Sequence, residues 1–251
     1  MPRDNLWTRD QLLLALRLYM RTPFGRLHRH NPEIIRLAGQ IGRTANALAM
    51  KACNFANLDP ALQARGIRGL SNLSQADRQI WDEFAANPEA LAAEAEEAAA
   101  RLTGEVIAPE IQIPAGETEV EQVVRARRVQ SFFRAAVLTS YENRCAITGL
   151  AVPELLTASH IIPWKVSVER RADPRNGLCL NALFDRAFDR GLITIDEKLR
   201  VVVSSRLRTA ASEADLDCSV QAAHGRELRL PKRLAPDPIA LTYHRETVFQ
   251  G

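Results

Sequence analysis

Three side chains with chemistry of their own fall within one short stretch of the chain. His160 ends an apolar, β-branched run, Asn176 closes the polar loop that follows, and Asp185 lies in a segment that opens with Asn181 and stops at Gly191. Asn is a favourable helix cap and Gly a frequent helix stop, so we predict the order strand, loop, strand, helix. This order would bring the three side chains together. A histidine with a pKa near ~6.5 suits a general base at neutral pH, and carboxylate oxygens suit Mg²⁺ or Mn²⁺.

Five motifs surround these residues. They are C-x-x-T-G at 145–149, S-H-I-I-P-W at 159–164, D-P-x-N-G-L at 173–178, F-D-R-x-F-D-R-G-L-I-T at 184–194, and L-T-Y-H-R-x-x-V-F at 241–249. With these motifs the chain resembles the HNH nucleases with a ββα-metal core, in particular the branch found in predicted bacterial restriction endonucleases. The resemblance covers about half of the chain and implies an α+β fold with an HNH-like module at its C-terminal end.

The resemblance implies a metal-dependent endonuclease that leaves 5′-phosphate and 3′-hydroxyl ends. It gives His160 the role of general base, Asn176 that of a brace for the loop, and Asp185 that of a ligand to Mg²⁺ or Mn²⁺. The family often has Asp before the general base, whereas this chain has Ser159, which is a weaker ligand. Asp189 stands four residues after Asp185 on the same predicted helix face, so it either supplies the missing carboxylate or forms a salt bridge with a neighbouring arginine.

Basic residues near this segment are candidates for phosphate contacts, although a solvated loop can be equally basic. Arg186 and Arg190 are also the possible salt-bridge partners of Asp189. The candidates in the loop and helix are Lys165, Arg170, Arg171, Arg175, Arg186 and Arg190.

Other residues that often bind metals have structural interpretations here. The four cysteines are far apart and form no C-x-x-C pair, so we expect no structural zinc. Cys145 and Cys179 are predicted to be buried thiols. His244 is predicted to pack or form hydrogen bonds against the core.

The chain divides into three predicted segments. Residues 1–86 form an all-helical module, with Thr8 and Thr44 as caps and a helix-turn-helix-like arrangement around Gly42. Arg43 and Lys51 could contact DNA from this module, although protein contact or simple packing is an equal alternative. Residues 87–120 are predicted to be a solvated Ala/Glu-rich helix and a linker, and residues 121–251 the nuclease domain.

Composition limits the possible function classes. With 46% hydrophobic and 25% charged residues among 251, the chain is not a disordered protein. It has no long apolar run and no apolar signal core, so we expect a cytoplasmic protein without a membrane partner. The net charge of +3 permits double-stranded DNA as partner, and symmetric binding of a duplex would require a homodimer. The alternatives are a non-catalytic DNA-binding regulator with a degenerate site, and a nuclease for RNA or single strands.

Overall fold

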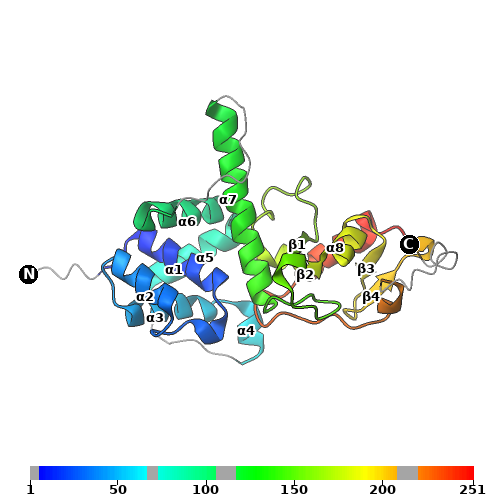
Figure 1. The fold of residues 1–251 in the computed structure, drawn as a ribbon, viewed down its shortest axis with the longest axis horizontal. Helices are drawn as coiled ribbons and strands as arrows, with labels where there is room; N and C mark the ends of the chain where they lie inside the picture. Colours follow the sequence, from blue (N-terminus) through cyan, green and yellow to red (C-terminus); the bar gives the residue numbers. More distant parts are fainter. Residues whose placement is uncertain (1–5, 67–72, 106–116, 208–219) are drawn as a thin grey trace, which may run out of the picture. The chain divides into compact units, whose positions relative to one another are not determined.

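The computed structural model describes residues 6–66, 73–105, 117–207 and 220–251 (Figure 1). Its contacts divide the chain into two compact units, Met1–Ala135 and Ala136–Gly251. The first is all-helical, and the second combines short strands with helices, so the mixed helix and sheet composition is confirmed. A search of the described helices finds none with the length and apolar character needed to cross a bilayer.

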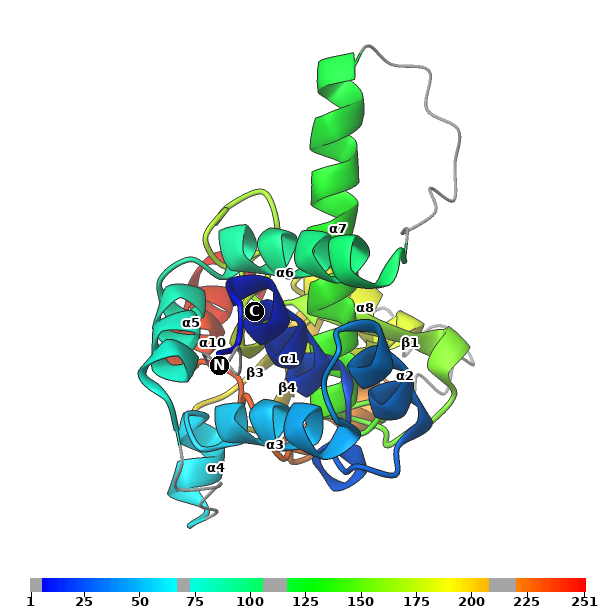
Figure 2. The same cartoon turned by 90° about the vertical axis from the view of Figure 1, so that its left-hand side faces the viewer.

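The first unit is built around α1, which is buried on most of its surface. Thr8 caps this helix through a hydrogen bond from the Gln11 backbone N–H, and Thr44 caps α3 in the same way. Helices α3, α5 and α6 pack against α1, and Figure 2 shows α1 between α3 and α6. The elements are α1 (Arg9–Arg21), the 3₁₀ turn η1 (Phe24–Arg26), α2 (Pro32–Gln40), α3 (Ala45–Ala56), α4 (Pro60–Ala64), α5 (Gln75–Ala86), α6 (Pro88–Thr103) and most of α7 (Glu117–Ser140).

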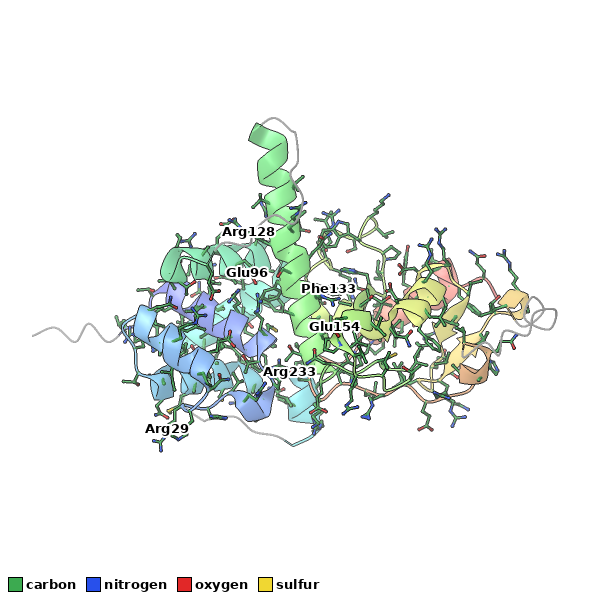
Figure 3. All side chains as sticks on the ribbon, viewed as in Figure 1. Arg29, Glu96, Arg128, Phe133, Glu154 and Arg233 are labelled. Atoms are coloured by element: carbon green, nitrogen blue, oxygen red, sulfur yellow. The ribbon has the colours of Figure 1, made fainter. Side chains whose placement is uncertain are left out.

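The Ala/Glu-rich segment is a helix, as predicted, but the prediction that it is solvated was wrong. Its alanines lie at helical spacing on one face, and Ala92, Ala95 and Ala98 are fully buried. The small side chains let α6 pack closely on α1. The Ala/Glu composition indicates a helix but does not indicate that the helix is buried. Glu96 is also buried, as an ion pair at 3.0 Å from Arg17 and 3.2 Å from Arg21 (Figure 3). Residues 106–116 of the predicted linker lie outside the described residues.

The helices of the predicted helix-turn-helix form, but a DNA-binding module of this type is not confirmed. Both proposed DNA contacts have partners within the unit. The Arg43 guanidinium donates to Leu6 O and lies 5.0 Å from the centre of the Trp7 ring. Lys51 Nζ lies 3.0 Å from Asp77, and its side chain is only 12% exposed. DNA contact by these two cations therefore remains a prediction without structural support.

The second unit contains the predicted strand, loop, strand and helix. Strand β1 (Leu156–His160) pairs antiparallel with β2 (Gly177–Asn181), so that His160 lies opposite Gly177. Asn181 caps α8 (Ala182–Asp189) by accepting a hydrogen bond from Phe184 N, as predicted. An antiparallel hairpin follows, formed by β3 (Ile193–Ile195) and β4 (Val201–Val203). The remaining elements are the end of α7, the 3₁₀ turns η2 (Pro153–Leu155), η3 (Pro174–Asn176) and η4 (Gln221–Ala223), α10 (Pro238–Tyr243) and the π-helical turn η5 (His244–Val248).

The C-terminal segment completes the core behind α8. The buried His244 ring stacks on Phe188 at 3.7 Å and forms hydrogen bonds with Thr194 Oγ1 and Phe188 O. This confirms the structural interpretation of His244. Gly191 has a φ of +65°, and a Cβ there would lie 2.0 Å from Val248 O, so only glycine allows the tail to pass this close.

The cysteines within the described residues are free thiols. Cys145 and Cys179 are buried, as predicted. Cys145 Sγ accepts hydrogen bonds from the backbone of Thr148, at 3.5 Å, and of Asn181, at 3.3 Å. These bonds join the C-x-x-T-G turn to the end of β2. Cys218 lies outside the described residues.

Candidate active site

His160 stands at the end of β1 with its ring in a defined orientation. Its Nε2 lies 3.0 Å from the Arg171 carbonyl oxygen. A carbonyl can only accept, so Nε2 carries the proton and Nδ1 carries the lone pair. A carbonyl of the loop between β1 and β2 therefore orients the ring. Burial lowers the pKa of His160 below its usual value, and the Arg171 charge adds to this effect, so the ring is neutral at neutral pH.

Trp164 and Arg171 hold the other sides of this histidine. The Trp164 ring meets the His160 ring edge-on, with 5.5 Å between the ring centres. The Arg171 guanidinium lies 4.9 Å from the centre of the Trp164 ring, and its Nε donates to Trp164 O at 2.9 Å. This arrangement was not predictable from local signals, because in the sequence Arg171 is one of several cations in a basic loop.

Asn176 ties together the two ends of the loop between β1 and β2. Its buried side chain accepts from Ile162 N at 2.8 Å and donates to Ile162 O at 3.1 Å. The same amide donates to Arg170 O at 3.3 Å. These are the contacts that a brace for the loop requires, and they place Asn176 behind the site and not in it.

Two carboxylates of α8, Asp185 and Asp189, line one pocket together with His160. Burial raises the pKa of Asp185, whereas the nearby Ser159 hydroxyl and the Arg186 charge lower it by less. Burial and the Asp185 charge raise the pKa of Asp189 to about 6. Across the described residues, Asp189 forms no ion pair, so the alternative of a salt bridge with Arg186 or Arg190 is not seen. Asp185 is half-buried and Asp189 is exposed, and the Asp185 charge raises the pKa of Asp189, so a cation bound beside them would stabilise both carboxylates.

A pocket of about 430 Å³ brings most of these groups together. Asn176 and the loop residues Lys165, Arg170, Arg171 and Arg175 do not belong to its lining. The sequence-predicted residues that line it are Ser159, His160, Asp185, Arg186, Asp189 and Arg190, beside Thr157, Ala158, Pro163 and Trp164.

The predicted loop cations have different surroundings. Arg170 forms an ion pair with Asp237 at 2.6 Å, and Arg175 forms one with Asp173 at 2.9 Å. Lys165 is exposed beside Trp164. Arg170 and Arg175 therefore each have a carboxylate partner within the protein. Asp237 was not among the predicted site residues, because its partner Arg170 lies 67 positions away in the chain.

The donor set of the pocket fits a hard divalent cation. Asp185 and Asp189 offer carboxylate oxygens, and within the described ranges the buried Ser159 Oγ forms no well-aligned hydrogen bond. Oxygen ligands are those that Mg²⁺ and Mn²⁺ prefer, with water and substrate phosphate completing the shell. Within the described part of the chain, no group of three or more His, Cys, Asp or Glu is placed to hold a metal. The protein would therefore supply only part of the coordination.

Comparison with known proteins supports an endonuclease domain at this place. Residues 145–196 match the family model described as HNH endonuclease. The matched segment contains β1, the braced loop, β2, α8 and β3, and therefore the whole pocket. No curated protein matches the chain. The domain match supports a nuclease of the hydrolase class that acts on DNA.

Proposed function

We propose that the chain is a divalent-metal-dependent DNA endonuclease with His160 as its general base. The observation that supports this most is the fixed His160 ring, whose protonated Nε2 is held by Arg171 O in a pocket shared with the α8 carboxylates. A neutral imidazole can take a proton from water through the ring nitrogen that carries its lone pair.

In this proposal His160 Nδ1 removes a proton from a water molecule as the water oxygen attacks phosphorus. The new P–O bond forms while the bond from phosphorus to the 3′ oxygen breaks. The departing 3′ oxygen takes a proton from solvent, which leaves 3′-hydroxyl and 5′-phosphate ends. Asp185, Asp189 and Ser159 would hold the metal ion, which supplies charge neutralisation on the phosphate and on the leaving oxygen.

The arginines of α8 are proposed to bind the substrate backbone. Arg186 and Arg190 line the same pocket as the carboxylates, and neither forms an ion pair within the described residues. A guanidinium without a protein carboxylate is suited to two-pronged contact with a phosphate. Exposed Lys165 could add a further contact with the duplex.

The first experiment is cleavage of supercoiled plasmid with Mg²⁺, Mn²⁺ or EDTA. We expect metal-dependent nicking or linearisation that is lost in His160→Ala. His30→Ala is the matched control, because it removes an exposed histidine of the helical unit and should cut like the wild type. Equal cleavage by wild type and His160→Ala, or cleavage that persists in EDTA, would show the proposal to be wrong.

Substrate choice and biological role follow from a second set of substrates. The motif resemblance supports restriction of foreign DNA, which predicts preference for duplex DNA over single strands and RNA. Phage DNA with modified and unmodified bases tests the defence role. Binding without cleavage on every substrate would favour the non-catalytic regulator. A homodimer on DNA is proposed for symmetric cutting, and sedimentation with a short duplex would measure it.

A further inference from the structure

The loop between β1 and β2 is anchored from outside the matched nuclease segment. The anchor is Asp237, which caps α10 and lies beyond residues 145–196. One carboxylate oxygen accepts from Arg170 Nη1 at 2.6 Å, and the other accepts from Ile239 N at 2.9 Å. The Asp237 backbone N–H also donates to Arg175 O at 2.8 Å. Asp237 therefore contacts the loop at two points while it caps α10.

Asp237 is connected with His160 through two residues, Arg170 and Arg171. The side chain of Arg170 is fixed by Asp237, and its carbonyl is fixed by the Asn176 amide at 3.3 Å. The next peptide carbonyl in the chain, that of Arg171, is the acceptor for His160 Nε2. A shift of the Arg170 backbone therefore moves the group that orients the general base. Hydrogen bonds weaken steeply with distance and angle, so a small shift matters.

We propose that Asp237 is a positioning residue for His160, acting through Arg170 and the Arg171 carbonyl. This inference rests on the proposed function, because it assumes that His160 is the base. The C-terminal segment thereby belongs to the working nuclease, although no residue of it lines the pocket. The pair is partly exposed, with side chains 28% and 18% accessible, and such pairs contribute little to global stability. Its main effect is on local geometry.

The substitution Asp237→Asn tests the positioning of His160 separately from the capping of α10. Asparagine still caps α10, because its carbonyl oxygen can accept from Ile239 N. Its amide nitrogen would face the Arg170 guanidinium, donor against donor, and the bridge is lost. Arg170→Gln removes the other partner and leaves the cap untouched. Glu142→Gln is the matched control, because it breaks the exposed ion pair with Lys232 in the same unit.

The kinetic test measures kcat and KM on a DNA duplex at saturating metal. We expect Asp237→Asn and Arg170→Gln each to lower kcat about tenfold or more, since small misplacement of a catalytic group has effects of this size. KM should stay within about twofold, the double variant should be no worse than the singles, and Glu142→Gln should match wild type. If Arg170 instead serves as a DNA contact, Asp237→Asn frees it and KM falls while kcat is unchanged. That result, or unchanged kcat in both variants, would overturn the inference.

An independent readout follows the His160 ring by long-range ¹⁵N–¹H NMR. Wild type should show His160 protonated at Nε2, and Asp237→Asn should show a mixed or altered tautomer. Glu142→Gln should keep the wild-type signal. This measurement needs no cleavage, so an inactive wild type would refute the proposed function while the NMR result still decides the inference. An unchanged tautomer in Asp237→Asn would exclude the positioning role.

Discussion

Acid should destabilise the second unit through the buried His244. Its pKa falls from 6.5 to about 4 in the folded protein, mainly because burial disfavours the charged ring. The unfolded chain therefore binds the proton more tightly, and stability is lost as pH falls from about 7 towards 4. Integration over these two values gives a loss of about 2 kcal/mol between pH 7.5 and pH 5 from this residue alone.

The measurement is urea unfolding at both pH values, followed by methyl NMR signals of Ile193 and Ile195, which lie in the core strand β3. His244→Gln lowers stability at pH 7.5 because the stack on Phe188 is lost, but it should remove the loss of about 2 kcal/mol that His244 contributes between pH 7.5 and pH 5. His30→Gln, at an exposed site, should retain the wild-type dependence. The same pH dependence in wild type and His244→Gln would refute the reasoning, because another group would then be titrating.

Three further predictions concern the metal site and the two cores. Asp189 has a pKa of about 6 and must lose its proton to bind a metal. The affinity for Mn²⁺, measured by calorimetry, should therefore fall about tenfold from pH 7 to pH 5. Asp189→Asn should remove this pH dependence. Glu96→Ala leaves Arg17 and Arg21 without their buried partner and should lower the free energy of unfolding, measured by thermal unfolding, by about 3 kcal/mol or more. Glu97→Ala breaks a partly exposed ion pair and should lower it by less than about 1 kcal/mol. Gly191→Ala places a Cβ 2.0 Å from the Val248 carbonyl oxygen and should lower the melting temperature strongly. Gly225 has a similar φ, but no atom lies within 4 Å of a Cβ built there. Gly225→Ala should therefore lower the free energy of unfolding by only about 1 kcal/mol. Equal melting temperatures for the two glycine variants would contradict the close approach of the tail.

The part of the site that could be predicted is the part encoded by local signals. Asn181 as cap and Gly191 as stop define α8, and the apolar runs define β1 and β2, so the grouping of His160 with Asp185 followed directly. Caps and periodicity depend on neighbours in the chain, and such neighbours are visible in the sequence.

What could not be predicted depends on contacts between distant residues. Ala-rich α6 has the composition of a solvated helix, and only its fit on α1 shows that its alanines are core. Lys51 and Arg170 have the residue type of a phosphate contact, yet each has a carboxylate partner 26 and 67 positions away in the chain. Charge alone does not distinguish a cation that binds DNA from one that anchors a loop.

The stack of His244 on Phe188 also has a consequence for synthesis of the chain. Domains form as the chain leaves the ribosome, from the N-terminal end onwards. The segment with the pocket, residues 145–196, emerges well before residues 238–251, which cover the back of α8. During that interval Phe188 lacks the ring that buries it in the finished protein. The matched segment would thus finish packing only when translation has delivered the tail, and a chain cut short before His244 should leave Phe188 incompletely packed.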